Sequence, residues 1–187
     1  VDLVSEQGLS LIALPEKDLA KTESELNALL LEHKPDYVIN TCILKSDEDV
    51  LLSLVAGQQD IPLVQLSSNL MFQMLEEQIY TENDEANVNL ALFKFEQQIT
   101  ENARRHLILR TGWLLGHQDD LLHMLLKQMK QNVEVVLPDV PLISPTPAED
   151  VARVLLAMIL QCDCAEGLWG TYDYSAVEAL SAKAFAQ

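Results

Sequence analysis

The chain is short of positive charge, cysteine and aromatic residues. Its 187 residues include 12 Lys and Arg against 29 Asp and Glu, which gives a net charge of −17. Nucleic acid and anionic membrane surfaces would be repelled by this charge, so neither is expected as a partner. The three cysteines, Cys42, Cys162 and Cys164, have no spacing of a disulfide framework. Only Cys162 and Cys164 lie close together, so no metal site is expected either.

Long apolar runs are also missing. No stretch approaches the roughly 20 residues that a membrane-spanning helix needs, and no basic region of a secretory signal opens the chain. We therefore expect a cytoplasmic protein. The chain does not begin with Met, and we expect its true start to lie upstream. At 49% hydrophobic residues it has enough apolar material for a folded core, which excludes a disordered chain.

Apolar periodicity predicts strands that alternate with helices. The expected strands cover residues 9–15, 37–42, 61–66, 106–111, 133–138 and 167–175, and the expected helices residues 22–33, 47–56, 88–104, 121–130, 147–161 and 176–187. Alternation of this kind gives a parallel sheet with helices on both faces. The predicted fold is α/β, a doubly wound parallel sheet.

Three segments together resemble one family. HLILRTGWLLG (106–116) is similar to a strand of the form I-L-R-T-S-W-V-Y-G. IPLVQLSSNLMF (61–72) is similar to a strand that ends in a Ser-Thr pair, and VNLALFKFEQQI (88–99) to a helix that carries Tyr-x-x-x-Lys. The chain thus resembles the extended short-chain dehydrogenase/reductase family, in the branch of dTDP-4-dehydrorhamnose reductase. The resemblance implies a Rossmann-like NAD(P)-binding fold with a small C-terminal substrate-binding part.

The resemblance also implies where the domains divide. Residues 1–115 would form the Rossmann-like core, without its first strand and glycine-rich loop. Residues 116–187 would form a part similar to sugar-nucleotide-binding domains, interleaved with the core. The family's G-x-x-G-x-x-G motif is absent among the six glycines, and the motif either lay upstream or never existed in this protein.

The catalytic positions implied by the resemblance are Ser68 and Lys94. In the family the lysine lowers the pKa of a tyrosine one helical turn earlier, and the tyrosine moves a proton beside hydride transfer. Here that earlier position is Leu90, which cannot carry a proton. General acid–base help is typically worth about 10²–10⁴-fold in rate. Lys94 has a second interpretation, as a solvated lysine on a helix surface, and Ser68 as an ordinary turn former.

The resemblance implies NAD or NADP as cofactor, held by Asp18, Asn40, Ser67 and Lys94. Asn40 has an alternative role, because an Asn at the end of a strand often satisfies loop backbone. For the substrate, a nucleotide or sugar nucleotide, the resemblance implies Arg110 and Thr146. Basic residues are few in this region, whereas a diphosphate usually requires Arg or Lys.

Two functions therefore stay open. The favoured one is a catalytically impaired relative that binds a nucleotide or sugar nucleotide, or regulates another enzyme, and Leu90 supports it. The alternative is an active NAD(P)-dependent reductase or epimerase of a nucleotide-linked sugar, supported by Ser68 and Lys94. A homodimer or a regulated enzyme partner is compatible with both.

Overall fold

The computed structural model describes residues 8–14, 22–42, 47–69, 91–116, 121–131, 137 and 144–186. Its main feature is a four-stranded parallel sheet in the order β1-β2-β3-β6. These strands are β1 (Val38–Asn40), β2 (Leu63–Ser68), β3 (His106–Thr111) and β6 (Gly170–Tyr174). The α/β fold with a parallel sheet is as predicted.

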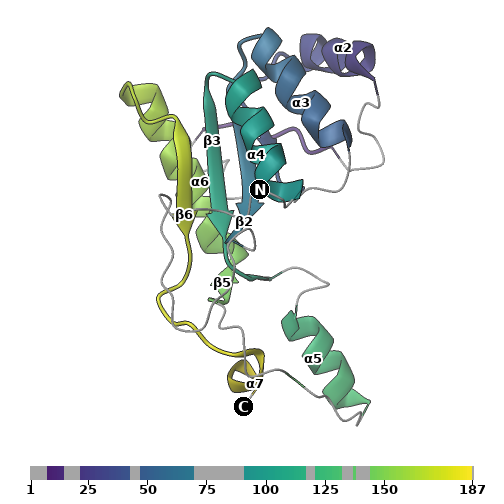
Figure 1. Ribbon diagram of the computed structural model, residues 1–187, viewed down its shortest axis with the longest axis vertical. Coiled ribbons are helices and arrows are strands. Elements are labelled where there is room, and N and C mark those ends of the chain that lie inside the picture. The colour runs from purple at the N-terminus through teal and green to yellow at the C-terminus, as the bar shows by residue number, and fades with distance from the viewer. Residues whose placement is uncertain are drawn as a thin grey trace.

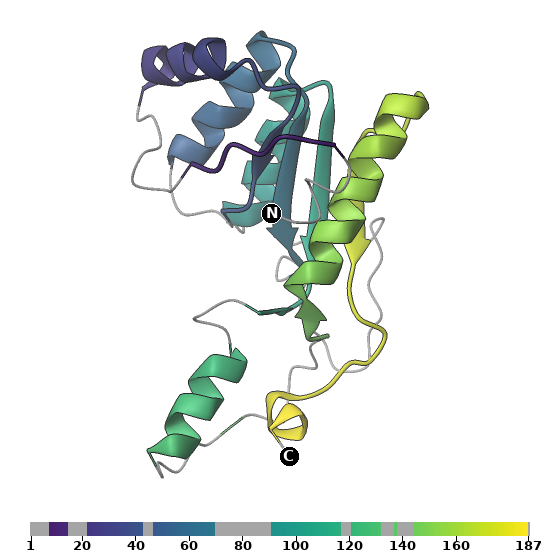
Figure 2. The ribbon, with the colours of Figure 1, turned by 180° about the vertical axis from the view of Figure 1, so that it is seen from behind.

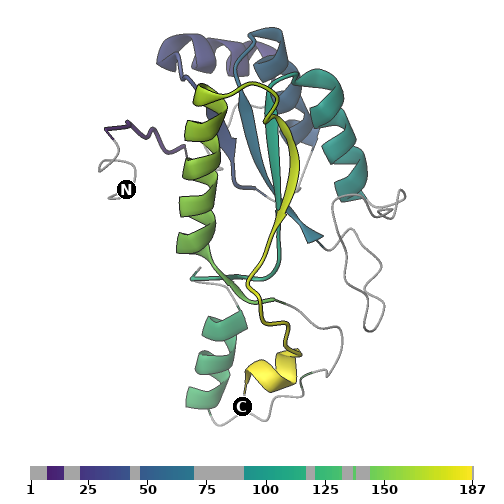
Figure 3. The ribbon, with the colours of Figure 1, turned by 90° about the vertical axis from the view of Figure 1, so that its left-hand side faces the viewer.

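Helices cover both faces of this sheet. On one face lie α2 (Glu23–His33), α3 (Asp47–Gln58) and α4 (Ala91–Asn102), and on the other lies α6 (Ala148–Cys164). Figure 3 shows the sheet between α4 and α6, and Figure 1 shows α4 running opposite to the strands that it joins. The sequence dictates these layers, because strand residues alternate between faces and each face of the central strands carries buried apolar residues.

A smaller group of elements follows the carboxyl ends of the strands. A two-stranded sheet pairs β4 (Leu114–Leu115) with β5 (Thr146–Pro147), and two further helices are α5 (Leu121–Lys130) and α7 (Ala182–Phe185). In Figures 1 and 2, α5 and α7 lie beyond the carboxyl ends of the strands, away from the main sheet. The bounds of α5 are those predicted from the sequence, whereas the short strands β4 and β5 were not predicted.

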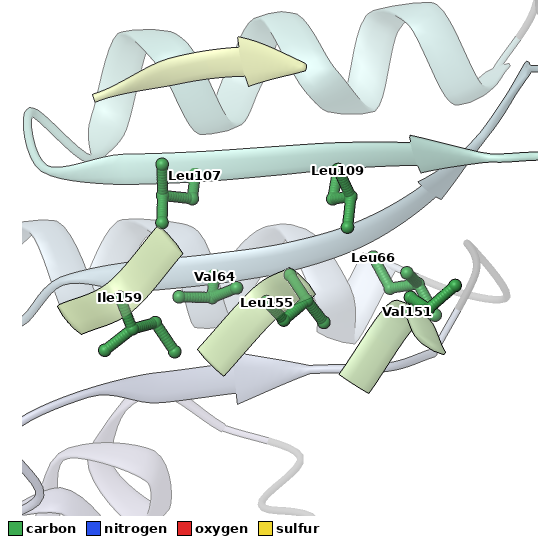
Figure 4. Close-up of a cluster of buried hydrophobic side chains, with 7 residues drawn as sticks. All are labelled: Val64, Leu66, Leu107, Leu109, Val151, Leu155 and Ile159. Carbon is green, nitrogen blue, oxygen red and sulfur yellow. The ribbon is translucent and has the colours of Figure 1, made fainter. Parts of the chain in front are cut away.

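The face under α6 is an apolar core. Val64, Leu66, Leu107 and Leu109 of the two central strands meet Val151, Leu155 and Ile159 of the helix, and each of these seven side chains is buried. Figure 4 shows the three helix residues pointing at the strand residues. Because the helix residues are spaced by four, they share one face of α6.

The opposite face packs α3 and α4 closely. Phe95, Ile99 and Ala56 meet Leu63 and Ile108 from the central strands. Gly57 makes the close helix contact possible, because a Cβ there would collide with the backbone carbonyl of Asn102 at the end of α4. This packing sets the height of α4 along β2 and β3.

Two sequence predictions are wrong, one strand and one helix boundary. The segment 9–15 was expected as a buried strand, but its described residues 9–14 form no strand, and Leu9, Leu11, Ile12 and Leu14 are 41 to 53% exposed. The described sheet offers them no neighbouring strand. The final helix was expected over residues 176–187, but α7 begins only at Ala182. Ser181 sets that start, because its side chain caps the helix by accepting a hydrogen bond from the N–H of Ala184. The strand predicted at 133–138 lies almost entirely outside the described residues.

Candidate functional site

The strands β2, β3 and β6 end together at one edge of the sheet. In the strand register Ser68 lies beside Thr111, and Thr111 lies beside Tyr174. Open parallel sheets bind their ligands at the carboxyl ends of the strands. Ser68 is buried at this edge, 7% exposed, and the hydroxyl of Thr111 donates to the carbonyl oxygen of Ser67 over 3.3 Å. The predicted position of Ser68 at a strand end is therefore present in the structure, while its catalytic role stays a prediction.

A buried ion pair lies just inside this edge, on the face covered by α4. Arg110 donates from Nε and Nη2 to Glu96 Oε2 over 3.1 and 2.8 Å, and Ser67 donates from Oγ to Glu96 Oε1 over 2.6 Å. Glu96 is 4% exposed and Arg110 8%. Arg110 Nη1 also lies 3.8 Å from a carboxylate oxygen of Asp173 on β6. The network thus joins α4 to three strands.

This network changes how two predicted residues are understood. Ser67 was expected to bind cofactor and Arg110 to bind substrate. Both side chains contact Glu96, and their contacts with ligands stay predictions. Glu96 was not among the residues predicted from the sequence, so the sequence reasoning missed it. A signal was available: a lone arginine inside an apolar strand requires a buried carboxylate, and Glu96 shares a helix face with Ile99.

A second polar network closes the end of β1. Asn40 donates to the side-chain oxygen of Gln65 over 2.9 Å, and its own oxygen accepts from the N–H of Cys42 over 3.1 Å. Gln65, which is 1% exposed, donates to the carbonyl oxygens of Cys42 and Leu66. The alternative role considered for Asn40, to satisfy loop backbone, is therefore confirmed, and its contact with a cofactor stays a prediction.

Lys94 and the two serines are not brought together. Lys94 is exposed, whereas Glu96, two residues later, is buried against Ser67. Two residues correspond to about 200° around a helix, so the two side chains leave α4 on opposite faces. The exposure favours the interpretation of Lys94 as a solvated lysine. Leu90 and Asp18 lie outside the described residues.

Thr146 links the segments that follow the strands. It is 1% exposed. Its N–H donates to the carbonyl oxygen of Trp113 over 2.6 Å, and its hydroxyl donates to that of Ser144 and accepts from the N–H of Ala176. Gly112 permits the approach, because a Cβ there would lie 2.6 Å from the Ser144 oxygen. The structure places Thr146 in the loop framework of the site, and its contact with a substrate stays a prediction.

The two side chains whose pKa values are raised lie at the opposite end of the sheet. Tyr37, just before β1, donates to a carboxylate oxygen of Asp163 at the end of α6 and stacks at a tilt on Trp169, with ring centres 6.5 Å apart. Burial raises the pKa of the Tyr37 hydroxyl above its ordinary value of 10.0, and the bond to Asp163 raises it further. Burial also raises the pKa of the neighbouring Cys162 thiol. These groups connect β1 to α6 and are remote from the strand ends.

A cavity of about 300 Å³ lies between α6 and the strands β3 and β6. Its lining is mostly apolar and includes Leu107, Leu109, Met158, Tyr172 and Tyr174. None of the predicted site residues lines it.

Within the described part of the chain, no group of three or more His, Cys, Asp and Glu could hold a metal ion. None of the helices described there is long and apolar enough to cross a membrane.

Comparison with solved structures finds close matches in fold. A dTDP-4-dehydrorhamnose reductase from Clostridium acetobutylicum is 22% identical with a TM-score of 0.85, over 99% of this chain and 72% of that one. The enzyme from Bacillus anthracis, solved with NADP, is 19% identical with a TM-score of 0.81 over the same shares. WbmG of Bordetella bronchiseptica, solved with NAD and UDP, is 12% identical with a TM-score of 0.74, over 97% of this chain and 69% of that one.

These matches establish the fold of this chain. The ligands found in those structures are properties of those proteins. A comparison with curated proteins finds no match. The model of the RmlD substrate binding domain family matches residues 46–187, which include the central strands β2 and β3, the buried ion pair and the elements beyond the strand ends. Since this match covers most of the sequence, the chain belongs to the RmlD substrate binding domain family.

Proposed function

We propose that this protein binds a nucleotide or sugar nucleotide at the carboxyl end of its sheet, is catalytically impaired as a reductase, and serves as a binding or regulatory protein. The observation that carries the proposal is the orientation of α4. The helix turns Glu96 inward to Ser67 and Arg110, and turns Lys94 outward to solvent. A lysine on the outer face cannot assist a proton transfer at the strand ends.

NAD or NADP is the nucleotide that we propose, since the relatives from Bacillus anthracis and Bordetella bronchiseptica were solved with NADP and NAD. Such a cofactor supplies a hydride when bound. The described residues fit only part of this chemistry. Ser68 and Thr111 offer hydroxyls at the strand ends, but α4 provides no inward lysine among its described residues. We therefore derive no reaction step through the cofactor.

The diphosphate of a sugar nucleotide requires positive charge. Arg110 is the basic residue that the sequence suggested for this role. Two carboxylates lie beside it, those of Glu96 and Asp173. An arginine that already pairs with a carboxylate at 2.8 Å offers a diphosphate less attraction than an unpaired one would. We therefore expect Arg110 to bind a diphosphate only weakly, which is compatible with a role as the regulatory partner of another enzyme.

The alternative is an active NAD(P)-dependent reductase or epimerase of a nucleotide-linked sugar. Ser68 favours it, because a hydroxyl at the end of β2 could donate to the oxygen of a substrate carbonyl. The alternative requires another group to supply the proton, because Leu90 stands at the position that the resemblance assigns to the tyrosine.

Titration of the protein with NADPH, NADH and dTDP, followed by its thermal unfolding, tests the proposal. We expect a rise in the melting temperature with at least one of them, because a ligand that binds only the folded state stabilises it. We also expect no oxidation of NADPH in the presence of dTDP-4-dehydrorhamnose. Turnover that Ser68→Ala abolishes would establish the alternative. A melting temperature that none of the three nucleotides raises would refute binding. Turnover that appears in Leu90→Tyr alone would refute the argument from the outward Lys94, because the acid would then be the only group that had been lost.

A further inference from the structure

The contact between Ser67 and Glu96 fixes the height of α4 against β2. The hydroxyl and the carboxylate are 2.6 Å apart and both are buried. The strand ends one residue later, at Ser68, and Asn69 follows it at a rise of at most about 6.6 Å from Ser67. The helix runs in the opposite direction, so four residues back along it, at Leu92, the rise is about 6 Å in the same direction. Leu92 therefore lies level with Asn69, just beyond the end of β2.

Leu92 also lies on the side of α4 that faces the sheet. Residues 92 and 96 leave a helix on the same face, and the face of Glu96 is the one that contacts Ser67. Side chains of a helix lean toward its N-terminus, which carries Leu92 further toward the strand end. Its burial agrees with this position, since Leu92 is half-buried although it is the second residue of the helix, whereas Lys94 is exposed.

We infer that residue 92, and not residue 94, is the position from which α4 faces the ligand site, and that Leu92 determines which ligands the site accepts. Leu92 places an aliphatic wall where a cation would be needed to bind phosphate oxygens. An anion loses hydration against such a wall and gains no partner in return. The site would then hold the apolar face of a base or a nicotinamide more strongly than the anionic part of a nucleotide. The inference about ligands rests on the proposed function, while the placement of residue 92 does not.

The placement is tested without any ligand. Cys42, Cys162 and Cys164 are first replaced by serine, and pairs of cysteines are then introduced. We expect the pair Leu92→Cys with Asn69→Cys to be bridged by a short bis-maleimide at least about ten times faster than the pair Lys94→Cys with Asn69→Cys, because residue 94 projects from the opposite face. Equal rates, or a faster reaction of the pair that includes residue 94, would overturn the inference. Circular dichroism checks that both pairs are folded.

The effect on ligands is tested by adding a charge. Leu92→Lys should strengthen NADPH binding roughly threefold to tenfold, which corresponds to about 0.6–1.4 kcal/mol, since a cation attracts a nearby anionic ligand. Gln97→Lys is the matched control, because residue 97 is exposed on the same helix and the variant has the same net charge. Equal gains in both variants would overturn the claim about ligands, and so would an unchanged affinity in Leu92→Lys.

The two levels of the inference can fail separately. If neither the protein nor its variants bind NADPH, the ligand claim fails together with the proposed function, and the cross-linking still decides the placement. If the parent protein binds NADPH and Leu92→Lys weakens that binding, the proposed function stands and the role given to residue 92 is wrong.

Discussion

The two faces of the central strands are built on different principles. Toward α6, β2 and β3 present Val64, Leu66, Leu107 and Leu109, which form an apolar core with that helix. Toward α4 the same strands present the apolar residues Leu63 and Ile108, and they become polar as they approach their carboxyl ends. The polar residues on this face are Gln65, Ser67 and Arg110.

The difference shows how the two helices are positioned. Apolar contacts are not directional, so the contacts of α6 supply stability and tolerate small shifts. The contacts of α4 include apolar ones through Phe95 and Ile99, but also hydrogen bonds and an ion pair. These polar contacts are satisfied only at one height and one rotation of the helix. The polar face therefore defines the geometry of the candidate site, and the apolar face holds the sheet together.

Removal of Glu96 should have the largest effect on this contrast. Glu96→Ala leaves Arg110 charged and buried, and we expect the free energy of unfolding to fall by about 3–5 kcal/mol. Urea denaturation measures it. The exposed pair of Arg153 with Glu149 is the matched control, and Glu149→Ala should cost less than about 1 kcal/mol. Similar losses in the two variants would show that a buried ion pair contributes no more to the free energy of unfolding than an exposed one.

A cavity on the apolar face should have a comparable or slightly smaller effect. Leu109 is 1% exposed and belongs to the core under α6. Leu109→Ala should lower the free energy of unfolding by about 2–5 kcal/mol, from lost burial and the cavity that remains. We expect NADPH binding, if present in the parent protein, to keep its affinity when measured well below the melting temperature. A large loss of affinity would show that this face also shapes the site.

Gln65 tests the polar face away from any charge. Gln65→Leu removes the partner of Asn40 and the donor to the carbonyl oxygens of Cys42 and Leu66. Since buried groups are left without these bonds, we expect a loss of about 1–3 kcal/mol in urea denaturation. Gln59→Leu is a useful control, because Gln59 makes a hydrogen bond to Asn27 in a less buried place. A stabilised Gln65→Leu variant would contradict the importance of this network.

The smallest effect should come from alkaline pH at the remote end of the sheet. The pKa of Tyr37 is raised in the folded protein, so its hydroxyl stays protonated there while the unfolded chain ionises. Stability from this group is complete below pH 10.0, the unfolded value, and falls as pH rises above it. We expect the free energy of unfolding of Tyr37→Phe to fall less than that of the parent protein as the pH rises from about 10 to 11, because the variant lacks this one ionisable hydroxyl. Parallel pH profiles of the two proteins would disprove the role of Tyr37.

The sequence predicted those parts of the fold in which local pattern and packing agree. The strand 106–111 and the helix 121–130 have their predicted bounds, because the apolar spacing is clear and the flanking residues do not continue it. The segment 9–14 shows the opposite case. Its apolar composition indicates a strand, but a strand also requires a neighbour, and local pattern cannot report whether the neighbour is present.

The candidate site was less predictable, because its geometry depends on partners distant in sequence. Arg110 was predicted to bind substrate, but Glu96 and Asp173 on other elements determine its surroundings. For Lys94, the spacing of residues along the sequence did not determine how the helix is rotated against the sheet. That rotation of α4 is decided by Glu96, whose burial could not be read from its charge.

Thr146 has a consequence for the dynamics of the region beyond the strands. One residue joins the backbone at Trp113 between β3 and β4, at Ser144 before β5 and at Ala176 after β6. Amide hydrogen exchange at Thr146 and Ala176 should therefore proceed through a shared opening, at similar rates and with the same dependence on denaturant. The three segments that Thr146 joins would then open together, as one cooperative unit.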